Sequence, residues 1–471
     1  MSDTWAWFLS GVQWFFLGYV VALNAVYLLL SMLSVIYIRR YTSERDIAEI
    51  PPFYSAFAPP ISIIVPAYNE ETTIVTSIRS LFQIIYPDYE IIVVNDGSND
   101  GTLEELMREF SLIPMPESYT SALKTEKIKA VYQSTGHYNL RVIDKANGGK
   151  ADSLNAGISI SDNELVCCVD ADSLLQPDSL IRVVQPFIEA PETVACGGSI
   201  RIANGCRFSG SYLQEAGLPH NLLSLLQVVE YLRAFLFGRL GWSPMNAMLI
   251  ISGAFSVFRK EAVLAVGGYR TDTVGEDMEI IVRLHRYYRM RRENYKITFV
   301  PDPICWTQVP EDMRTLRNQR ARWQRGLGES LFSHRELLFS PKAGLVGWLA
   351  YPFMVAFELL SPIIELAGYV FMIVGFALGI VSPIAFAAFM TIALGMGFLL
   401  SLNALLLEEL SFHMYTRVSD IFKLLGVIVM ENLGYRQFIM LCRVQGLFQW
   451  LTKQGGWGDM KRQSLGHKAG Q

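Results

Sequence analysis

Apolar residues form two long blocks, one near each end of the chain, and a more polar stretch lies between them. Residues 4–38 contain no charged side chain, and about 20 consecutive apolar residues suffice to cross a bilayer. The first block therefore predicts a transmembrane helix within residues 1–40. A cleaved signal peptide is the alternative, but it would have a basic start and a shorter apolar stretch, whereas Asp3 is the only early charge.

The second apolar block is divided by prolines. Between residues 343 and 407 only Glu358 and Glu365 are charged, and Pro362 and Pro383 separate pieces of spanning length. We expect the spans of this region, 343–451, at residues 343–361, 363–381 and 384–407, with a weaker one at 421–451. Together with the first helix, these pieces predict an α-helical transmembrane region of about five spans.

Basic residues directly follow the first block and recur in the tail. They are Arg39, Arg40 and Arg45 after the first block, and Lys453, Lys461, Arg462 and Lys468 in residues 452–471. Because Lys and Arg are enriched in cytoplasmic segments, we expect an integral membrane protein with its N-terminus outside and with the middle stretch and the tail in the cytoplasm. Four later crossings would return the chain to the cytoplasm, which agrees with the basic tail.

In the middle stretch, residues 59–310, short β-rich runs alternate with longer amphipathic ones, which predicts an α/β domain. The runs 61–70 and 90–98 each read as a strand that ends in a polar turn. Open α/β sheets bind ligands at the carboxyl ends of their strands, so we expect a doubly wound, nucleotide-binding sheet. A hairpin at residues 95–97 is the alternative, because Asp-Gly is a strong hairpin signal.

Two further stretches mix apolar residues with polar ones at helical spacing, namely residues 221–240 and 313–338. The second carries the arginines Arg314, Arg317, Arg320, Arg322, Arg325 and Arg335. Such helices are typical of the headgroup plane of a membrane, and we expect interfacial helices within residues 311–340. The alternative is a solvated basic face.

The composition narrows the class of protein. Of the 471 residues, 51% are hydrophobic and 18% are charged, and the formal net charge is -4. These values exclude a small secreted or disordered protein, and no overall basic field points to nucleic acid. The six cysteines lack CxxC or Cys/His metal spacing, so we expect them to be reduced core residues.

A glycine pair within residues 144–157 lies just before a predicted helix. Gly148 and Gly149 are flanked by Lys145 and Lys150. Backbone amides at a helix start, together with ammonium groups, suit a diphosphate. Taken alone, such a loop is a weak signal.

Two carboxylates end the next apolar strand, because Asp170 and Asp172 follow the run 165–169 at alternate positions. Mg²⁺ is usually held by one or two carboxylates together with substrate phosphates. The pattern therefore predicts a metal site for Mg²⁺ or Mn²⁺, with Asp172 as a helix or turn cap as the alternative.

Two later motifs complete the candidate chemistry. Glu276 and Asp277 open an amphipathic helix, where acidic residues could simply answer the helix dipole. Gln319, Arg322 and Trp323 lie in the arginine-rich stretch.

Together and in this order, the segments resemble the processive family-2 glycosyltransferases, such as cellulose synthase, hyaluronan synthase and poly-N-acetylglucosamine synthase. The resemblance runs from Pro59 through the C-terminal spans. Its elements are Asp96 in Asn-Asp-Gly-Ser, the pair Asp170 and Asp172, Gly275-Glu-Asp277 for the family's Thr-Glu-Asp, and Gln319, Arg322 and Trp323 for Gln-x-x-Arg-Trp. The last element is the specific one.

The resemblance implies a GT-A type fold and a role for each matching residue. The residues that would bind the donor are Tyr68, Glu70, Asp96, Lys145, Lys150 and Asp170. Asp172 holds Mg²⁺ or Mn²⁺, Asp277 is the general base, and Gln319 and Arg322 meet the donor diphosphate. Gly253, Glu276 and Trp323 contact the acceptor, with Trp323 stacked beneath its terminal sugar, and Trp457 and Lys461 belong to a gating segment in the tail. Gly275 departs from the family's Thr, which bears on substrate preference.

The expected function is inverting transfer of sugar from UDP-glucose or UDP-N-acetylglucosamine to a β-linked polysaccharide, which leaves through the protein's own spans. A general base that takes the proton of the acceptor hydroxyl accelerates the transfer by about 10²–10⁴. A metal ion neutralises the charge of the departing diphosphate. The implied partners are the UDP-sugar, the growing polysaccharide, membrane lipid and accessory export subunits, with no nucleic acid. The alternatives are transfer of one sugar to a lipid or lipid-linked acceptor, and a transporter in which Glu358 and Glu365 form the ion pathway.

Overall fold

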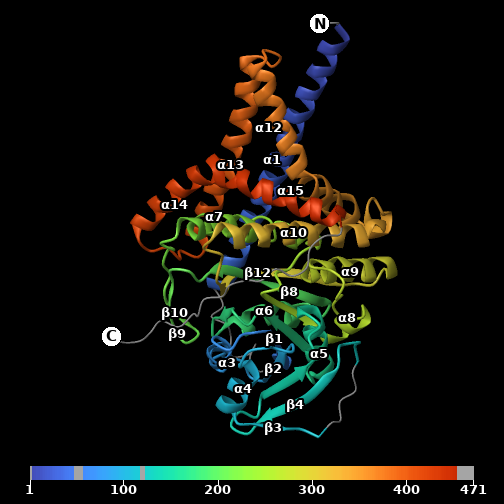
Figure 1. Cartoon of the computed structure of the whole chain (residues 1–471), viewed down its shortest axis with the longest axis vertical. Helices are drawn as coiled ribbons and strands as arrows, with labels where there is room; N and C mark the ends of the chain where they lie inside the picture. Colours follow the sequence, from blue (N-terminus) through green and yellow to red (C-terminus); the bar gives the residue numbers. More distant parts are fainter. Residues whose placement is uncertain (1–2, 47–56, 117–121, 453–471) are drawn as a thin grey trace.

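The computed structural model describes residues 3–46, 57–116 and 122–452, and a mixed sheet forms the centre of its lower body (Figure 1). Within these residues the sheet has ten strands. Their order is β3 (Leu112–Pro114), β4 (Ile128–Ser134), β5 (Leu140–Lys145), β2 (Tyr89–Asn95), β1 (Ile61–Ala67), β6 (Leu165–Val169), β11 (Phe255–Arg259), β8 (Thr193–Ile202), β12 (Lys296–Thr307) and β7 (Leu174–Leu175).

Four neighbouring strands, β5, β2, β1 and β6, pair in parallel and form the part of the sheet that the sequence predicts. Most of their residues are apolar because these strands are buried on both sides, as at Ile61, Ile63 and Ile64. Beyond β6 the sheet becomes mixed, since β11 runs antiparallel to both β6 and β8. The α/β prediction is therefore confirmed, with a mixed rather than a purely parallel sheet.

The turn after β2 leads into a helix and not into a hairpin. β2 pairs in parallel with β1 and β5, and after residues 95–97 the chain enters α4 (Thr102–Phe110). The hairpin alternative is thus wrong. The remaining helices of this body are α3 (Ile74–Leu81), α5 (Lys150–Ile160), α6 (Ser179–Glu189) and α8 (Lys260–Ala265), and a small second sheet pairs β9 (Arg207–Ser209) with β10 (Tyr212–Glu215).

Three helices lie between the sheet and the long apolar helices (Figure 1). They are α7 (Leu222–Leu236), α9 (Glu276–Arg291) and α10 (Met313–Ser333). α7 packs against β8 on one side and against α13 (Pro383–Ser411) and α14 (Val418–Met430) on the other, while α10 packs between α9 and α15 (Arg436–Thr452). α7 and α10 occupy the stretches predicted as interfacial helices.

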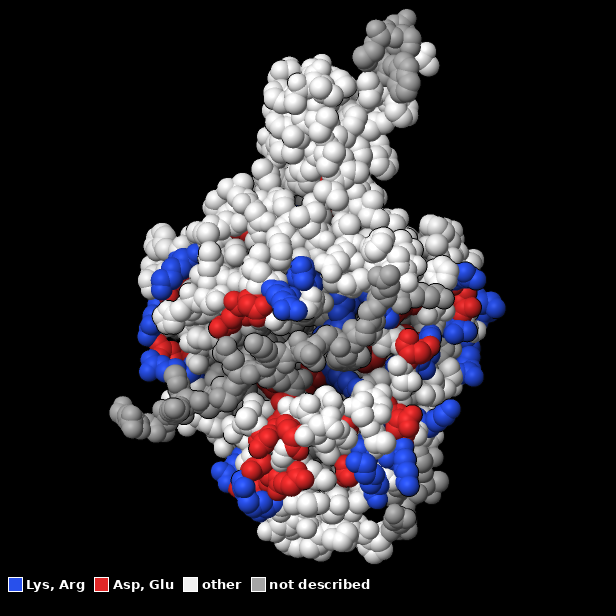
Figure 2. All heavy atoms as spheres, viewed as in Figure 1, with Lys and Arg blue, Asp and Glu red and all other residues white. Residues whose placement is uncertain are grey.

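Three helices rise away from the sheet and carry almost no charge on the visible face (Figures 1 and 2). They are α1 (Asp3–Asp46), α12 (Ser361–Ala377) and α13. By length and composition, the described residues contain three helices able to cross a membrane, at Trp7–Tyr41, Pro383–Ser411 and Val418–Thr452, and a fourth if the bent pair Val346–Leu359 and Ser361–Ala377 counts as one span. The protein is therefore membrane-associated, with fewer candidate spans than the five predicted.

Three of the predicted pieces are not straight independent spans, and the structure gives the reasons. Val346–Leu359 is bent by 47° from α12, so residues 343–361 and 363–381 are the two halves of one bent pair. Residues 421–451 are interrupted at Leu433 and Gly434, which have non-helical dihedral angles. α14 and α15 run across the rising helices beside α7 and α10 (Figure 1).

α12 and α13 are joined at the end furthest from the sheet, so the chain rises in α12 and returns in α13 (Figure 1). α14 consequently begins on the side of the molecule where the sheet lies.

Candidate active site

The ends of β1, β2 and β6 open onto one large cavity of about 1520 Å³. Eleven of the residues predicted for the site line this cavity: Tyr68, Asp96, Lys150, Asp170, Asp172, Gly253, Glu276, Asp277, Gln319, Arg322 and Trp323. They come from the ends of β1, β2 and β6, the start of α5, the segment before β11, the start of α9, and α10, which are far apart in the sequence. The structure thus brings together most of the predicted site.

Asp96 is fixed by a ring of donors. The Lys145 ammonium lies 2.5 Å from its Oδ1, and the backbone N–H groups of Gly148 and Gly149 donate to its two oxygens over 3.0 and 2.8 Å. The amides that the sequence assigned to a diphosphate are therefore engaged by this carboxylate. The glycine loop positions Asp96, and the phosphate-loop interpretation is not supported.

Two predicted donor-binding residues lie behind the cavity rather than in its lining. Lys145 is fully buried between Asp96 and Asp152, 2.6 Å from the latter. Glu70 is 2% exposed and accepts a hydrogen bond from Thr73 Oγ1 over 2.6 Å. These placements do not support a direct uridine contact by either residue, because both groups are occupied within the fold.

Lys150 connects the donor side of the cavity with the start of α9. Its ammonium forms an ion pair with Asp170, lies 3.9 Å from Glu276 and donates to the carbonyl of Gly253 over 3.3 Å. Burial alone lowers the pKa of Lys150, but the neighbouring carboxylates outweigh it and raise that pKa above its usual value. The lysine therefore stays charged and neutralises one of the two strand-end carboxylates.

Asp172 is the carboxylate suited to a divalent cation. Burial in the cleft and the nearby charge of Asp170 raise the pKa of Asp172 to about 6. A cation would reverse that penalty, and two carboxylates that line a cavity open to substrate phosphates fit Mg²⁺ or Mn²⁺. Among the described residues no group of three or more His, Cys, Asp or Glu side chains is placed to hold a metal ion, so such an ion would need further ligands from the substrate.

Asp277 has both carboxylate oxygens held by backbone amides at the start of α9. Met278 N–H donates to Oδ1 over 2.9 Å and Gly253 N–H donates to Oδ2 over 3.2 Å. A side chain at position 253 would crowd this contact, since a Cβ there would lie 3.2 Å from Lys150 Nζ and 3.3 Å from Asp277 Cβ. Asp277 lines the cavity, and these two hydrogen bonds fix the orientation of its carboxylate there.

Its neighbour Glu276 is buried, and burial together with the charge of Asp277 raises the pKa of Glu276 to about 7, against the opposing effect of Lys150. Glu276 is therefore close to half-protonated near neutral pH. It lines the same cavity as Asp277.

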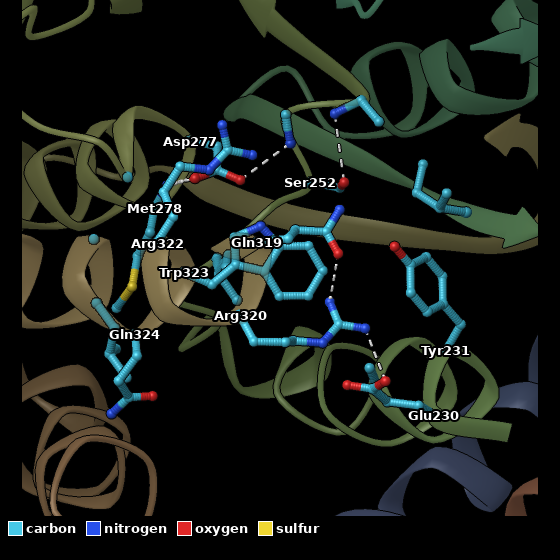
Figure 3. Close-up of a pocket in the computed structure, with 18 of the residues that line it drawn as sticks. Glu230, Tyr231, Ser252, Asp277, Met278, Gln319, Arg320, Arg322, Trp323 and Gln324 are labelled. Atoms are coloured by element: carbon cyan, nitrogen blue, oxygen red, sulfur yellow. Dashed lines mark hydrogen bonds and ion pairs between the residues drawn. The ribbon is translucent and has the colours of Figure 1, made fainter. Parts of the chain in front are cut away.

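α10 presents Gln319, Arg322 and Trp323 to the cavity from the side opposite the sheet (Figure 3). The Trp323 side chain is 45% exposed. Behind it lies Arg320, whose guanidinium carbon is 4.1 Å from the centre of the Trp323 ring. Sequence reasoning missed Arg320 as well as Glu230 and Tyr435, which also line the cavity. For Arg320 and Glu230 the sequence holds a weak signal of a functional role, because each is a charged residue within a helical stretch that also carries apolar residues.

The cavity continues between the long helices. Tyr27, Glu358, Glu365 and Arg443 are also among its lining residues, and Glu358 pairs with Arg443 at 2.9 Å. The two glutamates thus face a polar interior and not lipid, as expected from the cost of an unpaired carboxylate in a membrane.

The predicted gating residues Trp457 and Lys461 lie outside the described residues. Nothing in the described part of the chain bears on their role.

The fold and the site define a membrane-associated glycosyltransferase. A family model described as glycosyltransferase like family 2 matches residues 59–326, more than half of the chain. The chain belongs to this family, as its motifs suggest.

Two curated relatives carry the same name. The chain is 29% identical over 272 residues to poly-β-1,6-N-acetyl-D-glucosamine synthase of Staphylococcus epidermidis, a match that covers 58% of this chain and 55% of that protein. It is 30% identical over 274 residues to the synthase of that name from Staphylococcus aureus strain COL, with 58% and 55% covered. The chain therefore spans about half the length of the curated relatives it matches.

Among solved structures, the chain is similar to the mannosyltransferase PcManGT of Pyrobaculum calidifontis in complex with GDP-Man and Mn²⁺. The TM-score is 0.52 at 18% sequence identity, and the match covers 93% of this chain and all of that one. At this identity the similarity establishes a shared GT-A fold.

Proposed function

We propose that this protein transfers a sugar from a UDP-sugar, with inversion, to the end of a growing β-linked polysaccharide. One observation carries the proposal: a single cavity is lined by Asp96, Asp170 and Asp172 from the strand ends, by Asp277 at the start of α9, and by Trp323 of α10. A nucleotide sugar and an acceptor chain end can meet in this cavity at the carboxylate. The names of the Staphylococcus relatives favour UDP-N-acetylglucosamine as the donor.

In the donor half, Asp96 and Tyr68 would hold the uridine, with Lys145 and the glycine loop fixing Asp96 from behind. Asp170, oriented by Lys150, would meet the ribose side, and Gln319 and Arg322 would meet the diphosphate from α10. Asp172 would hold Mg²⁺ or Mn²⁺, which supplies charge neutralisation for the leaving diphosphate. Glu70 would support the turn after β1.

In the acceptor half, Asp277 would take the proton from the acceptor hydroxyl as the hydroxyl oxygen attacks the anomeric carbon of the donor sugar. The two backbone hydrogen bonds to the Asp277 carboxylate keep it in one orientation, which lowers the entropic cost of reaching the reactive geometry. Trp323 would stack beneath the terminal sugar, with Gly253 and Glu276 along the wall. The Asp277 carboxyl would lose its proton once UDP departs.

We further propose that the polysaccharide leaves along the part of the cavity lined by Glu358 and Arg443. Polar side chains there could exchange hydrogen bonds with sugar hydroxyls. In this arrangement the N-terminus is outside, the catalytic body of residues 59–310 and the C-terminus are cytoplasmic, and lipid surrounds α1, α12 and α13. Accessory export subunits would receive the chain on the far side.

The test uses the purified full chain in lipid nanodiscs with Mg²⁺ or Mn²⁺ and a panel of UDP-sugars, measuring UDP release and product size. We expect one UDP-sugar to give long polymer, and Asp277→Asn to give none while still binding UDP. Products extended by a single sugar on lipid would overturn processivity. An active Asp277→Asn variant would overturn the assignment of the base.

A further inference from the structure

Arg320 occupies the centre of a cluster that reaches three helical segments. Its Nη2 donates to Glu230 Oε2 of α7 over 2.8 Å, and Tyr435, at the helix break before α15, donates to the same oxygen over 2.6 Å. Arg320 and Tyr435 lie 90 and 205 positions after Glu230 in the sequence. Figure 3 shows Arg320 and Glu230 joined in this way beneath the cavity.

The same guanidinium contacts two residues of the Gln-x-x-Arg-Trp segment. Nη1 of Arg320 donates to Gln319 Oε1 over 3.1 Å, and the guanidinium carbon lies 4.1 Å from the centre of the Trp323 ring. A planar guanidinium can donate to two acceptors and stack on an aromatic face at the same time. One buried cation therefore touches both the side chain facing the diphosphate and the aromatic ring facing the acceptor.

Arg320 is a costly residue to bury unless it has a role that repays its desolvation. Its side chain is 2% exposed, and a buried charge is strongly unfavourable without a partner. Burial lowers the pKa of Arg320, but Glu230 and Tyr435 outweigh this and raise it, so the guanidinium remains charged. By contrast, Trp323 is 45% exposed into the cavity, so packing fixes only part of its ring.

We propose that Arg320, held in place by Glu230 and Tyr435, is the positioning residue that sets the orientation of Trp323 for the acceptor sugar. This inference rests on the proposed function and adds to it a link between the acceptor platform and α7 and the helix break at residues 431–435. The ligand concerned is the saccharide chain end.

The experiment measures donor and acceptor kinetics separately for Arg320→Lys, Glu230→Gln and Tyr435→Phe, with a short β-linked oligosaccharide as the added acceptor. Lysine keeps the charge opposite Glu230 but loses the planar face and the second donor. A misplacement of about 1 Å can cost 10²-fold in rate. We expect Arg320→Lys to raise the acceptor KM at least about tenfold and to shorten the polymer, while the KM for the UDP-sugar changes much less.

The matched control is Arg317→Lys, an exposed arginine one turn earlier on α10 that is not among the cavity-lining residues. It should behave like the unmodified protein. If Arg320→Lys does not fold, the milder Glu230→Gln and Tyr435→Phe variants decide the matter. Each should shift the acceptor KM in the same direction, and their double variant should be less than additive because both act on one oxygen of Glu230.

The failures of the two proposals are distinguishable. An unmodified protein that transfers no sugar would overturn the proposed function. An unmodified protein that polymerises, with cluster variants whose acceptor KM is normal or whose donor and acceptor constants change equally, would overturn the positioning role of Arg320.

Discussion

Gly275 and Gly326 meet backbone to backbone, and this contact joins the helix that carries Asp277 to the helix that carries Trp323. A Cβ on Gly275 would lie 2.7 Å from the Cα of Gly326, and a Cβ on Gly326 would lie equally close to the Cα of Gly275. No side chain fits between these two segments. The glycine that stands in place of the family's threonine is therefore matched by a glycine on α10, and their contact fixes the spacing between the helices that carry Asp277 and Trp323.

The first prediction concerns this contact. Gly275→Thr restores the Thr-Glu-Asp motif of the family, yet we expect it to lower polymer synthesis by at least about tenfold, since α9 must move away from α10. Turnover of the UDP-sugar by the purified variant is the measurement. Gly136→Ala is the control, because a Cβ at Gly136 meets nothing within 4 Å. Activity equal to or above that of the unmodified protein would contradict the argument.

The second prediction concerns the metal. Asp172→Asn leaves a divalent ion without its carboxylate, so we expect UDP release to fall by about 10² or more and to respond little to added Mg²⁺ or Mn²⁺. The readout is a metal titration of UDP release, with EDTA-treated protein as the reference. Asp88→Asn, an exposed aspartate, serves as control and should keep the normal metal response. Unchanged activity in Asp172→Asn would remove the metal assignment.

The third prediction concerns pH and stability. Burial raises the pKa of Glu276 to about 7, from 4.5 when exposed, so the folded protein binds more protons than the unfolded chain between these values. The free energy of unfolding should therefore decrease as pH rises from about 4.5 to 7, by at most about 3 kcal/mol at roughly 1.4 kcal/mol per unit. Thermal inactivation in detergent across this range is the measurement.

The comparison variant is Glu276→Gln, which cannot titrate. Lys150, Asp277 and Arg322 all act on the charge of Glu276 and remain in the variant. The decrease between pH 4.5 and 7 should become shallower in Glu276→Gln. An identical pH dependence in both proteins would show that another group is responsible.

Local patterns predicted the strand ends well and the contacts between distant segments poorly. Asp96, Asp170 and Asp172 follow apolar runs directly, and parallel pairing of β1, β2 and β6 brings them to one edge. The engagement of Gly148 and Gly149 by Asp96 could not be foreseen, since it joins segments about 50 residues apart. A phosphate and a buried carboxylate satisfy backbone amides equally well, so sequence alone does not distinguish them.

The number of spans shows the same limit. Hydropathy measures length and composition, and residues 421–451 satisfy both. It does not register the break at Leu433 and Gly434, nor the packing of α15 against the arginine-rich α10. That packing depends on small residues such as Gly446, where a Cβ would lie 2.3 Å from the carbonyl oxygen of Ala321.

The last prediction concerns Trp323, for which two roles compete. An exposed tryptophan near a membrane often serves as an interfacial anchor, but Trp323 lines the cavity, on the same helix as Gln319 and Arg322. A sugar platform needs a flat ring held near Asp277, so Trp323→Ala should abolish polymer synthesis while UDP binding and membrane insertion persist. Trp323→Phe keeps a stacking face and should retain part of the activity.

Trp348, 55% exposed and not among the cavity-lining residues, provides the matched control, and Trp348→Ala should leave polymer length unchanged. If Trp323→Ala made full-length polymer at the normal rate, the platform would lie elsewhere; if both alanine variants reduced membrane insertion alike, Trp323 would be an anchor.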